Sequence, residues 1–115
     1  MSAQETVQKY LKALKNKQDW SQFLADDMVF INNGKEIRGK ENYIESTKRF
    51  FSSIQSLEVR NILVDGDLAC ALNHYTLSSP SGNTIISDVA EIYSVHEGKF
   101  TSFAIYFDTA PFAPK

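Results

Sequence analysis

The chain has 115 residues, the length of one domain with a single hydrophobic core, and we expect residues 1–115 to form that one domain. Its formal net charge is −2 and it has no basic stripe, so composition gives no reason to expect a nucleic acid or an anionic membrane surface as a partner. The first residues resemble no secretory signal and no segment has the length of a membrane span, so we expect a cytoplasmic location.

Three helices are expected before residue 57. Apolar side chains recur at helical spacing from Glu5 to Lys17 and predict an amphipathic helix. A capping-box-like start at Asp19 predicts a short second helix ending near Ala25 or Asp26. Residues 28–33 then alternate as a short strand, the pair 33–34 forms a turn, and helical spacing resumes after Gly39 to predict the third helix.

The remainder of the chain predicts sheet. Alternating strands are expected at 57–64, 68–78, 84–96 and 99–108, and the dipeptides at 65–66 and 97–98 are typical of tight hairpin turns. Helices followed by long antiparallel strands indicate an α+β fold with the helices on one face of the sheet. Strands of this length twist, so we expect a strongly curved, mainly antiparallel sheet that forms a cone with an internal pocket.

No metal or other cofactor is expected. Cys70 is the single cysteine, which excludes an internal disulfide. It lies in an apolar run, which predicts a small buried side chain. His74 and His96 are far apart, and the carboxylates are scattered without the spacing of a metal site.

The order of these elements and several short motifs resemble the nuclear-transport-factor-2-like superfamily, and within it the SnoaL-like and ketosteroid-isomerase-like proteins. The resemblance covers nearly the whole chain. It rests on residues 7–10 in the first helix, 23–27 before the first strand, 37–41 before the third helix, 98–99 in the last hairpin and 106–108 near the end. This fold hosts isomerases, dehydratases, cyclases, hydrolases and non-catalytic binders, so it does not by itself imply an activity.

The resemblance to ketosteroid isomerase implies roles for three positions. Tyr10 falls where that family has a tyrosine that donates to the substrate carbonyl, and Glu91 where it has a carboxylic acid held neutral by an apolar site, a system used as a worked example in general accounts of pKa tuning. Asn32 falls at the position of the aspartate base, and an asparagine cannot abstract a proton from carbon. His74 is then the best spare base, and Asn32 would orient the ligand or a water.

Two other members of the superfamily fit less well. Ala71, Asn73 and Ile105 fall where limonene epoxide hydrolase has its aspartate, arginine and aspartate, so that triad is absent. Scytalone dehydratase and the cyclases use histidine and aspartate, for which His74 and Asp88 are the candidates. A structural alternative exists for each candidate: Tyr10 as a core tyrosine, Glu91 as a solvated side chain, and His74 as a hydrogen-bonded histidine in a half-buried strand.

An apolar pocket is expected under the sheet. On the last strand Phe103, Ile105 and Phe107 share one face, which the family alignment turns toward the cavity. Its other expected lining residues are Phe30, Phe50, Phe51, Val89 and Tyr93, which suit a small apolar ligand with one or two polar groups. The alternative is that these rings fill the cone and leave no space.

Two functions remain open. The first is a SnoaL-like protein performing isomerase, lyase or hydrolase-type acid–base chemistry on a small apolar carbonyl-containing ligand without the usual aspartate base. The second is a non-catalytic dimeric binding or accessory domain with a vestigial pocket, so whether the chain is an enzyme is undecided. The opposite sheet face is apolar and predicts a homodimer; its residues are Ile86, Ala90, Ile92, Ala104 and Tyr106.

Overall fold

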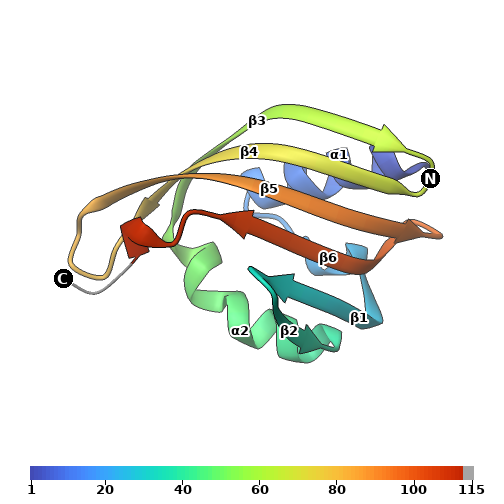
Figure 1. Ribbon diagram of the computed structural model, residues 1–115, viewed down its shortest axis with the longest axis horizontal. Coiled ribbons are helices and arrows are strands. Elements are labelled where there is room, and N and C mark those ends of the chain that lie inside the picture. The colour runs from blue at the N-terminus through green and yellow to red at the C-terminus, as the bar shows by residue number, and fades with distance from the viewer. Residues whose placement is uncertain (113–115) are drawn as a thin grey trace.

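The computed structural model of the chain describes residues 1–112, which form a curved six-stranded sheet with two α-helices packed against it (Figure 1). The helices are α1 (Ala3–Lys15) and α2 (Lys40–Ser53), with 3₁₀ turns η1 (Ser21–Phe23) and η2 (Ala110–Phe112). The strands are β1 (Leu24–Asn32), β2 (Lys35–Arg38), β3 (Ile54–Asp65), β4 (Leu68–Ser78), β5 (Thr84–His96) and β6 (Lys99–Phe107). The α+β prediction is confirmed.

The strands lie in the order β2-β1-β6-β5-β4-β3. Every neighbouring pair is antiparallel except β1 and β6, which run parallel. Burial alternates along the long strands, so that Val89, Glu91 and Tyr93 of β5 face the helices while Asp88 and Ala90 face away. The sheet therefore has a concave inner face that can hold a site and a partly apolar outer face.

The N-terminal helix is confirmed, although it begins at Ala3 rather than near Glu5. Ser2 caps it, because its side-chain oxygen accepts a hydrogen bond of 3.1 Å from the Glu5 amide. Its buried face includes Val7, Tyr10 and Leu11, which meet the inner face of the sheet. The helix thus brings Tyr10 to the concave side of β5 and β6.

The predicted second helix is wrong beyond its first turn. The Ser21 amide donates to the Asp19 carboxylate and the Gln22 side chain donates to the Asp19 carbonyl, each at 2.9 Å, so the reciprocal bonds of a capping box do not form. The helical turn stops at Phe23, and β1 begins at Leu24, which is buried and pairs with Phe100 of β6. Pairing with a distant strand has overridden the local helix signal.

A short strand that the sequence analysis did not predict follows β1. Asn33 and Gly34 adopt φ values of 47° and 91° and form a two-residue turn, after which β2 returns along β1 with Asn32 opposite Lys35. Gly39 then enters α2 with φ 92°, and its amide donates to the Met28 carbonyl at 2.8 Å. This bond fixes the start of α2 against β1, so that α2 crosses the concave side of the sheet.

The core between helices and sheet is built mainly from aromatic rings. Tyr10 packs edge-to-face on Phe100 with the ring centroids 5.0 Å apart, and Tyr93 lies 4.6 Å from Phe103. Phe30 meets Tyr43 of α2 at 4.7 Å. These rings fill the end of the cone beside α1 and leave the end beside α2 open.

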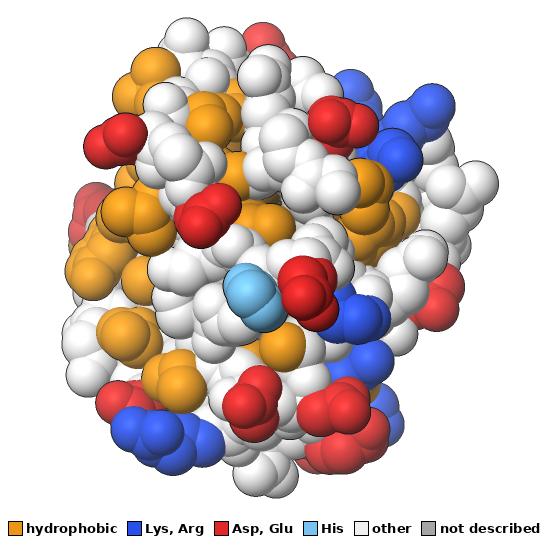
Figure 2. All heavy atoms as spheres, turned by 90° about the vertical axis from the view of Figure 1, so that its right-hand side faces the viewer, with side chains coloured by type: hydrophobic (Ala, Val, Ile, Leu, Met, Phe, Trp, Pro, Cys, Tyr) orange, Lys and Arg blue, Asp and Glu red, His pale blue; other side chains and the backbone are white. Residues whose placement is uncertain are grey.

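One end of the molecule holds the β3–β4 and β5–β6 turns, and charges of one sign do not cluster on its surface. Figure 2 shows acidic, basic and hydrophobic side chains interspersed there. Within residues 1–112, none of the helices has the length and apolar character needed to cross a membrane.

Candidate functional site

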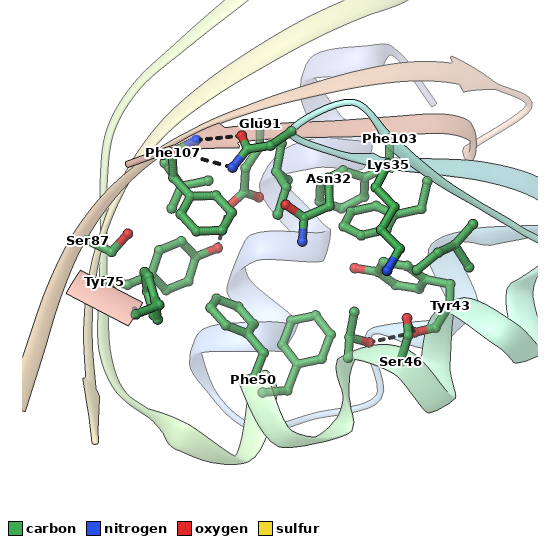
Figure 3. Close-up of a pocket in the computed structure, with 18 of the residues that line it drawn as sticks. Asn32, Lys35, Tyr43, Ser46, Phe50, Tyr75, Ser87, Glu91, Phe103 and Phe107 are labelled. Carbon is green, nitrogen blue, oxygen red and sulfur yellow. Dashed lines mark hydrogen bonds between the residues drawn. The ribbon is translucent and has the colours of Figure 1, made fainter. Parts of the chain in front are cut away.

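A cavity of about 510 Å³ lies between α2, the β1–β2 hairpin and the concave face of the sheet. Its size falls in the range of small-molecule sites. Most of its wall is aromatic or aliphatic, and Figure 3 shows these side chains around an open interior. The apolar lining residues are Phe30, Ile37, Phe50, Phe51, Val89, Phe103, Ile105, Phe107 and Phe112.

Among the described residues 1–112, Glu91 is the only carboxylate that lines this cavity, and its side chain is almost completely buried, with 2% of the residue exposed. Tyr75 donates a hydrogen bond to one carboxyl oxygen and Tyr93 to the other. Burial raises the pKa of Glu91, while the hydrogen bonds from Tyr75 and Tyr93 act in the opposite direction. A carboxyl group with a raised pKa can give or take a proton closer to neutral pH than an ordinary glutamate.

Two further tyrosine hydroxyls reach the cavity beside Glu91. Tyr10 enters from α1 and Tyr43 from α2, and both residues are buried. Burial raises the pKa of Tyr10 well above its usual range, with smaller contributions from Tyr43 and Glu91. Burial likewise raises the pKa of Tyr43. Both hydroxyls therefore stay protonated at neutral pH and can donate hydrogen bonds to a ligand oxygen.

The β1–β2 hairpin supplies the polar groups at another part of the cavity wall. The Asn33 side chain is occupied by the β6 backbone, since its amide donates to the Phe107 carbonyl and its oxygen accepts from the Phe107 amide, each at 3.2 Å. Asn32 and Lys35 make no such bonds, and Figure 3 shows both side chains directed at the cavity. The hairpin thus presents one amide and one amine to a ligand.

The structure brings together most of the residues proposed from the sequence. Tyr10, Asn32 and Glu91 all line the cavity, together with seven of the apolar residues expected there: Phe30, Phe50, Phe51, Val89, Phe103, Ile105 and Phe107. Tyr93 does not line it. Its side chain is fully buried behind the wall, where it donates to Glu91, so it supports the carboxyl group rather than contacting a ligand.

His74 lies outside the cavity, and the expectation that it supplies a base there is not met. Along β4 the inward residues are Asn73 and Tyr75, so His74 between them faces the opposite side of the sheet. Its Nδ1 lies 2.7 Å from Asp88 Oδ1, and Arg60 lies 3.8 Å from the same oxygen. The hydrogen bond to His74 lowers the pKa of Asp88. Because Asp88 is exposed, the pair is a surface interaction on the outer face.

Comparison with known proteins adds the family. A family model described as a SnoaL-like domain matches residues 7–103. The chain belongs to the SnoaL-like family. A comparison with curated protein sequences found no significant match.

Solved structures confirm the nuclear-transport-factor-2-like fold of this SnoaL-like chain. A candidate SnoaL-like polyketide cyclase from Jannaschia sp. CCS1 superposes with a TM-score of 0.82 and 19% identity, covering 98% of this chain and 93% of that one. A candidate isomerase from Bacillus subtilis superposes with a TM-score of 0.80 and 16% identity, covering 95% of this chain and 88% of that one. TerC, crystallised with polyporic acid, superposes with a TM-score of 0.80 and 16% identity, covering 96% of this chain and 94% of that one. At these identities the likeness establishes the fold alone.

Sequence reasoning missed several polar residues that shape the site of this SnoaL-like chain. Tyr75 was not singled out because the phase of β4 was open, and the alternation of 68–78 fits either face until β4 pairs with β5. Asn73 is buried on the same face, and its amide has no hydrogen-bond partner among the described residues. The sequence carries no signal that Tyr43 or Lys35 would reach a cavity, because Tyr43 falls within the expected third helix and Lys35 only follows the turn at 33–34.

Two smaller observations complete the site. Cys70 is half-buried on the outer side of β4 rather than in the core, and burial raises the pKa of its thiol. Across residues 1–112, no three His, Cys, Asp or Glu side chains gather closely enough to hold a metal ion. The cavity wall therefore carries one carboxyl group, three tyrosine hydroxyls, two asparagine amides and an amine, together with the hydroxyls of Ser46, Thr47, Ser87 and Thr109.

Proposed function

We propose that this SnoaL-like chain binds a small, largely apolar molecule carrying a carbonyl or comparable oxygen. The observation that carries the proposal is the aromatic cavity of about 510 Å³ with one buried carboxyl group, Glu91, on its wall. A cone completely filled by its own side chains would have favoured a vestigial pocket. Burial of the ligand's apolar surface provides most of the affinity, and the Tyr10 hydroxyl binds its oxygen.

We further propose acid–base chemistry of the isomerase, lyase or hydrolase type, with Glu91 as the group that transfers the proton. Asn32 has no proton to exchange with carbon, and His74 faces the other side of the sheet. Within the described part of the chain Glu91 is left as the only carboxylate at the cavity, and its raised pKa suits both donation and acceptance of a proton. Tyr75 and Tyr93 hold the carboxyl group in position. The alternative is binding without catalysis.

Binding is tested with 2-naphthol, an apolar ring system with one hydroxyl group, monitored by fluorescence titration. Tyr10→Phe keeps the ring that packs on Phe100 and removes only the hydroxyl, so we expect affinity to fall roughly 5-fold, as for one lost hydrogen bond. Tyr106→Phe is the matched control, because Tyr106 lies on the outer face and is 48% exposed. Absence of saturable binding, or equal affinity for the wild type and Tyr10→Phe, would overturn the proposal.

Catalysis is tested by proton exchange, which requires no knowledge of the natural substrate. The small apolar ketone 2-tetralone exchanges the hydrogens next to its carbonyl with deuterium oxide, and NMR follows the rate. We expect the wild type to accelerate this exchange and Glu91→Gln to lose the acceleration while still binding 2-naphthol. No acceleration by a protein that binds 2-naphthol would leave the binding-only function.

We also propose that two copies of the chain associate through the outer sheet face. Several apolar side chains are exposed on it, among them Ile86 at 51%, Tyr106 at 48% and Ile92 at 40%. Side chains of this kind, spread over neighbouring strands β4, β5 and β6, form a surface that association would remove from water.

A further inference from the structure

We propose that the ligand of this cavity is an amphipathic anion, with a carboxylate or other oxyanion bound by Lys35 and Asn32 at the β1–β2 hairpin. This inference rests on the proposed small-molecule function and names the chemical class of the ligand. It assigns a binding role to Lys35, which no motif in the sequence indicated.

The first observation is the position of Lys35. Among residues 1–112 it is the only basic residue that lines the cavity, and its side chain extends from β2 toward Tyr43 and Ser46 on the opposite wall (Figure 3). Its place is set by the tight turn at 33–34, which puts Lys35 directly opposite Asn32. The turn itself is tied to β6 through the two Asn33 bonds, so the hairpin fixes the backbone position from which the exposed Lys35 side chain extends.

The second observation is that residues 1–112 supply no anion for this amine. Lys35 forms no salt bridge with any carboxylate of residues 1–112, whereas Arg38 on the same strand pairs with Glu36. Glu91, the only described carboxylate at the cavity, accepts hydrogen bonds from Tyr75 and Tyr93 instead. A cation beside an apolar cavity without a counter-ion is complementary to a ligand that brings one.

Asn32 completes the anion site. Its side chain forms no hydrogen bond with the described part of the chain, and it reaches the cavity next to Lys35 across the β1–β2 pair. The amide N–H can donate to the second oxygen of a carboxylate while the amine binds the first. An asparagine at this position suits an anionic ligand better than an aspartate, whose charge would repel it.

The two polar parts of the cavity therefore differ in the oxygen they accept. The hairpin offers a cation and an amide to a charged oxygen, and the tyrosine hydroxyls beside Glu91 offer donors to a neutral one. The aromatic lining between them fits a ring system. The structure thus favours an apolar ring compound with an anionic group at one end and a carbonyl or hydroxyl group at the other.

The test compares 2-naphthoate with 2-naphthol, which share a ring system but differ in charge at pH 7, since a carboxyl group is ionised and a phenol is neutral there. Lys35→Met keeps an unbranched apolar side chain and removes the charge. Lys9→Met is the matched control, because Lys9 is exposed on α1 and does not line the cavity. All three proteins are titrated with both probes at low and high salt.

We expect Lys35→Met to weaken 2-naphthoate binding roughly 5- to 10-fold and to change 2-naphthol binding less than about 2-fold. Lys9→Met should change neither, and salt should weaken 2-naphthoate binding to the wild type more than to Lys35→Met. The inference is overturned if both probes respond equally to Lys35→Met, or if Lys9→Met has the same effect on 2-naphthoate. If neither probe binds the wild type, the proposed function fails, and the inference fails with it.

Discussion

Replacing Glu91 with glutamine tests the central group of the site through stability alone. In the folded chain both carboxyl oxygens accept tyrosine hydrogen bonds. The glutamine oxygen can replace only one of these acceptors, because its amide nitrogen is a donor. At pH 4 we expect Glu91→Gln to lower the free energy of unfolding by roughly 1–2 kcal/mol, the loss of about one buried hydrogen bond.

The pH dependence of this difference follows from the raised pKa of Glu91. Burial makes the folded chain hold the proton to a higher pH than the unfolded chain, in which a glutamate titrates near about 4.3. The stability from the protonated form is fully present below the unfolded pKa, and it is lost as pH rises through the folded pKa. Each unit of elevation removes about 1.4 kcal/mol from the wild type and nothing from Glu91→Gln. The cost of the substitution should therefore shrink as pH rises above about 4.3 and become constant above the folded pKa.

Urea unfolding at several pH values, followed by Trp20 fluorescence, measures this change. Trp20 packs against Tyr10 and Phe51, so its emission reports loss of the core. Glu58→Gln is the matched control, because Glu58 lies exposed on β3, the neighbour of β4. A cost that grows with pH would refute the reasoning, since it would show that the tyrosine hydrogen bonds stabilise the ionised carboxylate more than burial destabilises it.

Three further outcomes are expected. Asn32→Asp should gain measurable isomerisation of a β,γ-unsaturated ketone, since it restores a carboxylate at the base position of the ketosteroid-isomerase-like proteins; an intact variant without any gain, by absorbance assay, would argue against an oxygen site beside Tyr10 and Glu91. Asn33→Gly keeps the positive φ of 47° but removes both bonds to the Phe107 backbone, so urea unfolding should show a loss of roughly 1–2 kcal/mol, and an unchanged midpoint would contradict the tie between hairpin and β6. Ile86→Lys should convert a dimer to a monomer in analytical ultracentrifugation, because it places a charge on the outer face; a wild-type protein that is already monomeric at all concentrations would rule out that association.

The fold and much of the cavity wall could be predicted from the sequence because their signals are local. Strict alternation along 84–96 and 99–108 placed Glu91 on the same face as Val89, and Phe103 on the same face as Ile105. Residues two apart on a strand point to the same side of the sheet. The family resemblance then turned both sets toward the inside. The apolar spacing of the first helix likewise placed Tyr10 on a buried face.

Tertiary structure alone decided the features that depend on pairing between distant segments. Tyr75 lies on the inner face of β4 and His74 on the outer face, because β4 pairs in one register with β3 and β5. Leu24 became strand rather than helix because it pairs with β6, and the return of β2 brought Lys35 to the cavity wall. Alternation in sequence determines which residues share a face, but only strand pairing determines which face lies inside.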